Sequence, residues 1–373
     1  MRLPDPTRTP PDLDEWVRQV VRWHFHPRTG SPYWLRKARH LGFDPLQDIQ
    51  GFADLARFPD VSSEWRDIPA ADLVPRGSGR GAGGETGRGT AAHFSVYETG
   101  GTTGAPRRIV DLGDRREGLR FVNWMLDQHE FPRGEAGDWL YAGPSGPHLV
   151  GRNLPTLAGW RGALCHTIDL DPRWVKHLAR TGQEGVARQY LDHLADQVMT
   201  LARSQPIGVL AATPALLQAL LQRSDALLWM RRRLKGVLWF GTHLSAESRR
   251  TLRDEFLPGV KLVGLYGNTL MGIAPERPAL PDEPDRPVFQ PFFPYAAVQV
   301  VDSTTREPVA YEARGRVLVS LLGRELFLPM NLERDEAVRV APPAEAPVLT
   351  WDGVADVSPA PEADMGQVVE GVY

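Results

Sequence analysis

A segment dense in glycine and threonine contains the residues best suited to chemistry. Residues 93–97 alternate in polarity like a β-strand and run into Glu98-Thr99-Gly100-Gly101-Thr102-Thr103-Gly104-Ala105-Pro106-Arg107-Arg108. Glycines let backbone N–H groups approach an anion closely, and successive N–H groups in such a turn form an anion-binding nest. Threonine hydroxyls add donors, and a guanidinium binds two phosphate oxygens at once. The segment predicts a triphosphate or pyrophosphate cradle; a plain hairpin turn with exposed threonines is the alternative.

Other catalytic classes lack their motifs in this sequence. The glycine-rich segment is not a P-loop, because no Gly-Lys-Ser/Thr follows it. The histidines show no metal-ligand spacing, so no zinc site is predicted. Neither Ser145 nor Ser245 lies in a Gly-x-Ser-x-Gly elbow, which gives no support to a hydrolase.

Three more polar segments each follow a predicted strand. Apolar runs at 207–212, 236–240 and 260–265 end at Thr213, at Gly241-Thr242-His243 and at Tyr266-Gly267-Asn268-Thr269. Helices from 214 to about 222 and from 245 to about 256, capped by Thr213 and Ser245, separate these strands. The alternation predicts a parallel α/β sheet, and ligands of such sheets bind beyond the carboxyl ends of the strands. The three segments are therefore expected to share one pocket.

The rest of the chain supplies the framework for these segments. Residues 13–42 have helical spacing of apolar side chains, and the strands expected at 296–301, 315–321 and 325–328 have no helices between them. We therefore expect three parts: 1–90, a helical segment with a glycine-rich loop; 91–290, the α/β nucleotide- and acyl-binding core; and 291–373, a β-rich subdomain with a tail.

The bulk properties are those of an ordinary cytoplasmic protein. The 373 residues carry a formal net charge of −3, which argues against a nucleic-acid binder. The N-terminus has no apolar region of a signal peptide, and no apolar run is long enough to span a membrane. The single cysteine, Cys165, is expected to be a small core residue in a strand.

The motifs together resemble those of the adenylate-forming superfamily. Thr99 to Arg107 is similar to its phosphate-binding signature, with Arg107 at the lysine position. Tyr266-Gly267-Asn268-Thr269 resembles its Tyr-Gly-x-Thr-Glu motif, and Gly241-Thr242-His243 its adenine-contacting segment. A looser match leads from Gly315 to Asp335. The likeness covers roughly residues 40–355 and is greatest to the phenylacetate-CoA ligase branch, especially to the EhpF-like adenylating proteins of phenazine-antibiotic biosynthesis.

The resemblance implies a fold and a role for each motif. The fold is the large core of an adenylate-forming enzyme, with parallel α/β subdomains, helices on both faces and a small β-barrel-like subdomain. Thr99, Thr102, Thr103 and Arg107 hold the ATP phosphates, and Asp335 accepts the ribose hydroxyls. Further implied contacts to the nucleotide come from Gly100, Gly101, Gly104, Gly241, Thr242, His243, Tyr266, Gly267, Asn268 and Thr269.

The acid substrate is expected beside the nucleotide. His148, after the apolar strand 139–142, stands where relatives carry a histidine or aromatic residue that orients the acid; a solvent-facing loop histidine is the alternative. Aromatic and aliphatic residues at the strand ends would line the acyl pocket, although all are equally explicable as core. They are Tyr141, Trp239, Phe240, Leu265 and Leu270.

Two departures from the family pattern matter. Leu270 occupies the place of the glutamate that binds Mg²⁺, and a leucine cannot ligate a hard cation. Three alternatives follow: adenylation is slow, Mg²⁺ is held by phosphates, water and Glu98, or the protein binds an acyl-AMP that is made elsewhere. Residues 348–356 resemble the hinge to the small C-terminal domain, and only a tail rich in Pro and Glu follows, so we expect that domain to be absent.

The sequence thus predicts ATP-dependent adenylation of an aryl or medium-chain carboxylic acid. The acyl-AMP is expected to pass to a separate reductase, amide-forming enzyme or carrier protein. A degenerate homologue that only binds nucleotide or acyl-adenylate is the first alternative, favoured by Leu270. An acyl-CoA or acyl-protein synthetase-type transfer component is the second.

Overall fold

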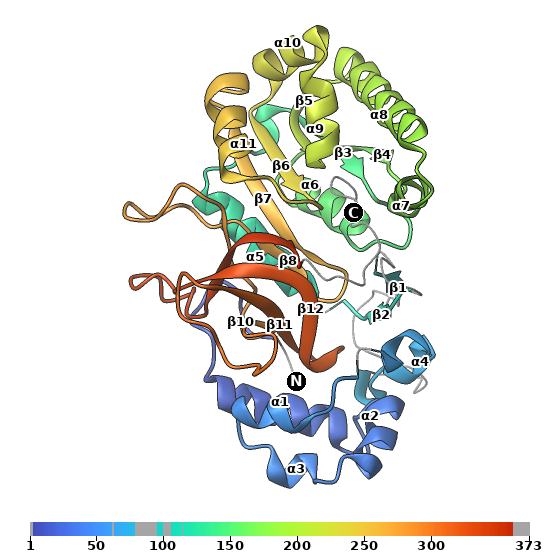
Figure 1. Cartoon of the computed structure of the whole chain (residues 1–373), viewed down its shortest axis with the longest axis vertical. Helices are drawn as coiled ribbons and strands as arrows, with labels where there is room; N and C mark the ends of the chain where they lie inside the picture. The colour runs from blue at the N-terminus through green and yellow to red at the C-terminus, as the bar shows by residue number, and fades with distance from the viewer. Residues whose placement is uncertain (1–2, 62, 79–94, 100–105, 114, 361–373) are drawn as a thin grey trace.

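Two β-sheets of different architecture organise the chain, one above the other in Figure 1. The computed structural model describes residues 3–61, 63–78, 95–99, 106–113 and 115–360. A separate two-stranded ribbon, β1 (Ser95–Glu98) and β2 (Arg108–Asp111), lies at the level where the two sheets meet.

The upper sheet is parallel except at one edge. Its order is β4-β3-β5-β6-β7-β8, and only β8 runs antiparallel to its neighbour. Every residue of β5 and β6 is buried, as expected for strands covered on both faces. The strands are β3 (Asp138–Gly143), β4 (Cys165–Asp169), β5 (Ile207–Ala212), β6 (Gly236–Phe240), β7 (Lys261–Asn268) and β8 (Gly272–Pro275).

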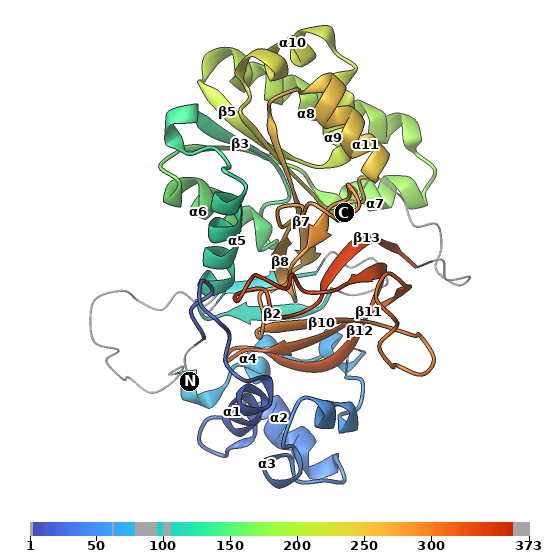
Figure 2. The ribbon, with the colours of Figure 1, turned by 90° about the vertical axis from the view of Figure 1, so that its left-hand side faces the viewer.

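Helices cover both faces of this sheet, as Figure 2 shows from the side. One face packs on α5 (Arg116–Gln128) and α6 (Val150–Trp160), the other on α8 (Glu184–Ser204), α9 (Pro214–Leu221) and α10 (Ser224–Arg233). Thr213 and Ser245 cap the helices that follow them, as predicted. The remaining elements of this half are α7 (Pro172–Arg180), α11 (Ala246–Thr251), a π turn at Leu252–Phe256 and a 3₁₀ turn at Gly134–Ala136.

The lower sheet is antiparallel throughout and rests on the N-terminal helices. Its order is β10 (Ala296–Val301), β11 (Arg314–Leu322), β12 (Phe327–Val340), β13 (Gly353–Pro359) and β9 (Val288–Phe289). The indole N–H groups of Trp16 and Trp34 donate to the carbonyls of Leu322 and Phe327, at 2.9 and 3.0 Å. The helices are α1 (Leu13–Phe25), α2 (Pro32–Lys37), α3 (Pro45–Asp48) and α4 (Ala70–Leu73), with 3₁₀ turns at Ala38–His40, Ala53–Arg57, Glu64–Arg66 and Arg76–Ser78.

The predicted fold class is confirmed: a parallel α/β part with helices on both faces, joined to a β-rich part. Two strands are longer than predicted. β7 continues through Tyr266 to Asn268, and β12 runs to Val340 and so contains Asp335. Cys165 is only half-buried, because β4 is the edge strand of its sheet.

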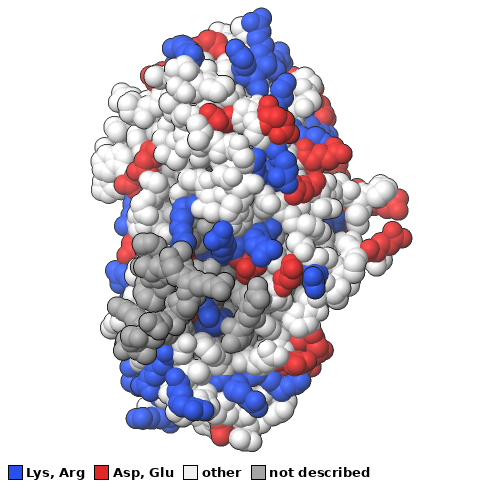
Figure 3. All heavy atoms as spheres, turned by 180° about the vertical axis from the view of Figure 1, so that it is seen from behind, with Lys and Arg blue, Asp and Glu red and all other residues white. Residues whose placement is uncertain are grey.

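The surface carries both signs of charge. Basic and acidic side chains are interspersed over much of the face in Figure 3, with a group of basic ones near its middle. Among the described residues, no helix is both long and apolar enough to cross a bilayer. The glycine-rich loop expected near the end of the first part, in residues 77–89, lies outside the described residues from position 79 onward.

Candidate nucleotide-binding site

The β7–β8 hairpin presents the Tyr266–Thr269 motif. Gly267 has a φ of +146°, and a Cβ there would lie 1.9 Å from the carbonyl oxygen of Gly272. Only glycine therefore fits this close approach. The Asn268 side chain accepts from the backbone N–H groups of Leu270 and Met271, both at 2.9 Å, which closes the turn.

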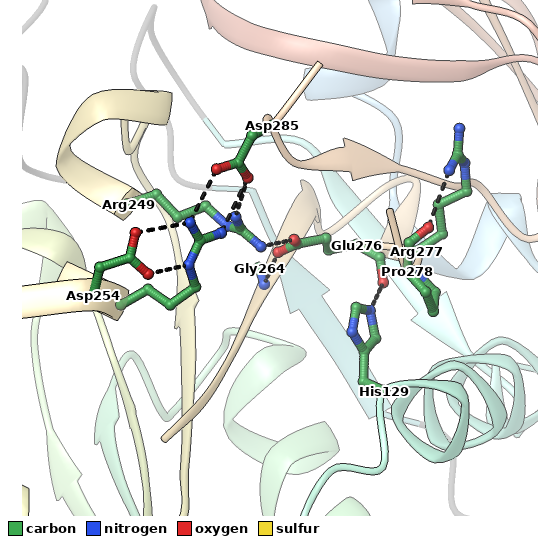
Figure 4. Close-up of polar contacts among 9 residues, drawn as sticks. His129, Arg249, Asp254, Gly264, Glu276, Arg277, Pro278 and Asp285 are labelled. Atoms are coloured by element: carbon green, nitrogen blue, oxygen red, sulfur yellow. Dashed lines mark hydrogen bonds and ion pairs between the residues drawn. The ribbon is translucent and has the colours of Figure 1, made fainter. Parts of the chain in front are cut away.

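A buried ionic network fixes the base of this hairpin (Figure 4). Glu276 follows β8, and its side chain accepts from the backbone N–H of Gly264 in β7 at 2.8 Å and from the guanidinium of Arg249 in α11. Its backbone carbonyl accepts from His129 at 2.8 Å. Burial raises the pKa of Glu276, and Arg249 opposes that shift. The network sets the position of the motif relative to α11 and α5.

The Gly/Thr loop is the segment 98–108, and its two ends form a stem that is bonded to the same hairpin. Thr99 donates from its backbone N–H to the carbonyl of Arg107 at 2.9 Å, and its hydroxyl accepts from the Arg107 N–H at 3.0 Å. The Thr269 hydroxyl donates to the carbonyl of Glu98 at 2.9 Å. Two segments that lie 171 positions apart therefore meet. The predicted residues Gly100, Gly101, Thr102, Thr103 and Gly104 lie outside the described residues.

Strand β12 brings Asp335 to this place from the lower sheet. Tyr266 donates its hydroxyl to Asp335 Oδ2 at 3.1 Å. Arg107 donates from Nη1 to Asn331 Oδ1 at 2.9 Å, and its Nη2 lies 3.9 Å from Glu333 Oε2. Thr99 and Arg107, the Tyr266 motif and Asp335 thus border one site at the junction of the two sheets.

Burial changes the protonation of this site. It raises the pKa of Asp335 to about 6, reinforced by the negative charge of Glu333 and opposed by Tyr266, Arg334 and Arg316. Burial likewise raises the pKa of Tyr266 well above its ordinary value, and Asp335 and Glu333 add to this. Tyr266 therefore stays a hydrogen-bond donor, whereas Asp335 changes charge near pH 6.

His148 lies beside the loop stem. It occupies the connection between β3 and α6, whose Pro147 carbonyl accepts from the Glu98 N–H at 2.8 Å. The side chain is 8% exposed, which does not suit a solvent-facing loop histidine. Burial lowers its pKa, and the nearby Arg173 lowers it further, so the imidazole is neutral at neutral pH. A neutral imidazole at this position is able to donate to an acid.

The segment Gly241–His243 ends β6 and so lies next to the Tyr266 motif. The pairing of Phe240 with Leu265 places Gly241 beside Tyr266. Gly241 has a φ of +94°, Thr242 is partly buried, and His243 is exposed, with Nδ1 3.0 Å from the Val357 carbonyl of β13. Both sheets therefore contribute to this edge of the site.

The residues predicted for the acyl pocket are core residues on two faces of the sheet. Tyr141, Phe240 and Leu265 pack in the cluster under α5 and α6, and the Tyr141 hydroxyl donates to the Pro144 carbonyl at 2.6 Å. Trp239 packs on the opposite face, 5.8 Å from the Phe289 ring. Leu270 is fully buried. Their role towards a substrate stays a prediction.

A hollow lined by other residues lies next to the hairpin. Its volume is about 400 Å³, including the part that is open to solvent. Arg115 lines it, donates to the carbonyls of Thr269 and Leu270 at 2.9 and 3.0 Å, and pairs with Glu325 at 3.1 Å. Its charge is thus compensated within the protein. The other lining residues include Leu149, Asn153, Met271, Ile273 and Phe292.

The positions considered for Mg²⁺ do not fit the ion. Leu270 offers no oxygen, and the Glu98 carboxylate is held by Arg108, at 3.0 Å, and by Arg173. Within the described ranges, no three His, Cys, Asp or Glu side chains are grouped so as to hold a metal. A cation at this site would therefore depend on ligands other than these side chains.

Several residues of the site were not predicted from the sequence. Asn331 and Glu333 contact Arg107 across a long stretch of sequence: Arg107 and Asn331 are 224 positions apart. Arg115 and Glu276 fix the hairpin from outside the motif. The one available signal was the alternation Asn331-x-Glu333-x-Asp335, which is unusual for a buried strand.

Comparisons with known proteins bear on the fold. No protein-family model and no curated protein matches the sequence. Solved structures of 2-hydroxyisobutyryl-CoA ligase do match. The complex with 2-HIB-AMP and CoA in an open conformation has a TM-score of 0.61 and 14% identity over 92% of this chain and 67% of that chain. The complex in the thioesterification state has a TM-score of 0.61 and 15% identity, over 94% and 69%.

A weaker likeness, with a TM-score of 0.45 and 15% identity, is to ATP-bound MatB from Rhodopseudomonas palustris, over 76% of this chain and 52% of that chain. The chain has the α/β fold of the core of adenylate-forming ligases and spans about two thirds of the 2-hydroxyisobutyryl-CoA ligase.

Proposed function

We propose that the chain binds ATP and activates a carboxylic acid as an acyl-AMP. The observation that carries this proposal is the meeting of three motif segments at one site, through the bonds Thr269–Glu98, Tyr266–Asp335 and Arg107–Asn331. In the reaction, a carboxylate oxygen attacks the α-phosphorus, the bond to the β-phosphate oxygen breaks, and pyrophosphate leaves.

The motif residues are assigned separate parts in that reaction. Arg107 binds the departing phosphates, together with Thr99, Thr102, Thr103 and the intervening glycines. Asp335 accepts the ribose hydroxyls, and Tyr266 lies against the adenine. His148 is buried and neutral, so it donates to the acid and orients it. Catalysis then rests on positioning and on stabilisation of charge by preorganised donors.

Neither Leu270 nor Glu98 provides a free carboxylate, so these side chains would not hold a Mg²⁺ ion, which would have to be held by the ATP phosphates and water. The Mg²⁺ ion, when bound, neutralises phosphate charge. Arg107 contributes positive charge from the protein side.

For the substrate and acceptor we keep the expectations drawn from the sequence. The acid is an aryl or medium-chain compound, and the setting is natural-product biosynthesis of the EhpF-like kind. The acceptor is a separate reductase, amide-forming enzyme or carrier protein. A route through an enzyme thioester is disfavoured, because burial raises the pKa of Cys165 to about 11 and keeps the thiol protonated.

A second candidate is a protein that binds nucleotide or acyl-adenylate without forming it. The burial of Leu270 and the engagement of Glu98 by two arginines favour it. This candidate and the first share the binding site and differ only in turnover.

Exchange of labelled pyrophosphate into ATP, measured over a panel of carboxylic acids, separates the two. We expect acid-dependent exchange, and a loss of about 100-fold in Arg107→Gln because a charged donor to the phosphates is removed. Arg203→Gln, which alters an exposed pair with Asp225, is the matched control and should exchange normally. ATP binding without exchange for any acid would support the second candidate. Failure to bind either ATP or an acyl-adenylate would refute both.

A further inference from the structure

Strand β12 carries three polar residues at alternate positions, Asn331, Glu333 and Asp335. Asn331 and Glu333 lie on the side of β12 that contacts Arg107, and Asp335 bonds to Tyr266 beyond a register shift in the pairing of β12 with β11. Asn331 and Glu333 are only 1% and 8% exposed. Polar groups are rarely buried without partners, so this row needs an explanation in its contacts.

Glu333 contacts Asn331 and Arg107, the residue proposed to bind the phosphates. Asn331 Nδ2 donates to Glu333 Oε1 at 2.6 Å, while Asn331 Oδ1 accepts from Arg107 Nη1 at 2.9 Å. The other carboxylate oxygen, Oε2, lies 3.9 Å from Arg107 Nη2. The three side chains form a closed triangle that fixes the plane of the Arg107 guanidinium. Burial lowers the pKa of Arg107, and the charge of Glu333 opposes this.

Glu333 also lies two positions before Asp335 in β12. After burial, the negative charge of Glu333 is the largest cause of the shift in the pKa of Asp335, and it raises that pKa. The other groups that face Asp335 are the Tyr266 hydroxyl from β7, Arg316 from β11 and its neighbour Arg334, and all of them act downwards. Arg316 is held in place by a bond of 2.8 Å to the Glu333 backbone carbonyl.

We propose that Glu333 is a positioning residue that links the two ends of the nucleotide site: with Asn331 it orients Arg107 for the phosphates, and it places a second carboxylate two positions from Asp335 in the same strand. This inference rests on the proposed function, because it assumes that a nucleotide occupies the site.

Two separable effects follow. Only the ionised form of Asp335 accepts two hydroxyls, so affinity for the ribose end rises with pH through about 6, where the carboxyl loses its proton. The preference for ATP over adenosine depends on the orientation of Arg107. Removing the charge of Glu333 changes both effects, whereas removing Asn331 changes only the second.

The test compares Glu333→Gln with the unaltered full-length chain. The amide keeps the shape and an oxygen for Asn331. Binding of adenosine, which has no phosphate to titrate, is measured by calorimetry from about pH 4.5 to 8. We expect the midpoint near pH 6 to fall by about one pH unit, because a like charge next to Asp335 is gone. Glu336→Gln removes another carboxylate of the same strand, which bonds to neither Arg107 nor Asn331, and should leave the midpoint unchanged.

A second variant tests the orientation of Arg107 towards the phosphates. Asn331→Leu leaves the charge of Glu333 in place, so the adenosine midpoint should stay where it is. The ratio of ATP to adenosine affinity at neutral pH should fall about fivefold to tenfold, since Arg107 loses a hydrogen bond that orients it. This variant keeps the inference testable should Glu333→Gln fail to fold.

The outcomes discriminate between the inference and the proposed function. A midpoint that is the same in Glu333→Gln as in the unaltered chain overturns the inference alone, as does an unchanged ATP preference in Asn331→Leu. If the unaltered chain binds neither adenosine nor ATP at any pH, the proposed function falls, and this inference with it.

Discussion

Asp335 is held in its strand at a cost to stability. Its carboxyl lies between the Tyr266 hydroxyl and the charge of Glu333, and its folded-state pKa of about 6 exceeds the ordinary value of 3.8. A group whose pKa is raised by folding favours the folded state at low pH, and that contribution is lost as pH rises from about 4 to 6. Above this window the ionised carboxylate therefore destabilises the fold.

Asp335→Asn should consequently stabilise the protein above pH 6 while impairing nucleotide binding. The shift corresponds to at most about 3 kcal/mol, and partial exposure to solvent reduces this to about 1–2 kcal/mol. Urea unfolding of both proteins at several pH values measures the difference, which should vanish near pH 4. Equal stability at all pH values would show that the surroundings of Asp335 do not penalise its charge.

At the scale of elements, the β7–β8 hairpin depends on Glu276. Glu276→Gln should leave Arg249 with its charge in a buried position, although Asp285 still pairs with it at 3.3 Å. Losing one partner of a buried pair costs about 3–5 kcal/mol, and the remaining partner should bring the loss to about 2–3 kcal/mol. Thermal denaturation measures the loss, and nucleotide affinity should fall with it because Tyr266 and Thr269 move.

The comparison variant for Glu276 is Arg253→Gln. Arg253 binds Asp254 and Asp285 at the surface, and its side chain is 36% exposed. We expect a loss below about 1 kcal/mol. Were both variants to lose the same amount, the special role of the buried pair in holding the hairpin would be untenable.

The elements also show what sequence patterns can and cannot predict. Strands β5 and β6 match the predicted bounds because each is a short apolar run closed by a capped helix. β12 was predicted too short: after Leu328 its side chains alternate with polar residues that pair inside the site. The sequence predicted Asp335 and Arg107 separately, through motifs. It could not predict their link through Asn331, because tertiary contacts between distant residues leave no local pattern.

At the scale of the whole molecule, the N-terminal helices hold the β-rich sheet through buried polar contacts. His24 of α1 is 1% exposed, stacks on Phe327 at 5.5 Å and bonds through Nε2 to the Gly323 carbonyl at 2.8 Å. Burial lowers its pKa to about 4, and the bond to Gly323 opposes the shift. The neutral form, which donates from Nε2, is therefore the form that the fold accepts.

This single histidine makes the attachment of α1 sensitive to acid. Because its folded-state pKa lies below the ordinary value of 6.5, the stabilisation is complete above pH 6.5 and is lost as pH falls towards 4. The loss amounts to about 3 kcal/mol over that window. As pH falls, the contribution of His24 to the free energy of unfolding decreases while that of Asp335 increases. The stability between pH 4 and 6.5 therefore reflects the difference between these two contributions.

His24→Gln isolates this contribution, because glutamine keeps a donor for the Gly323 carbonyl and does not titrate. The substitution lowers stability at neutral pH through imperfect packing, so the informative quantity is the slope with pH. Between about pH 6.5 and 4.5 the unaltered chain should lose on the order of 2 kcal/mol more than the variant. His40→Gln, at an exposed position, should keep the original slope. Parallel pH profiles for His24→Gln and the unaltered chain would mean that protonation of groups other than His24 causes the loss of stability at low pH.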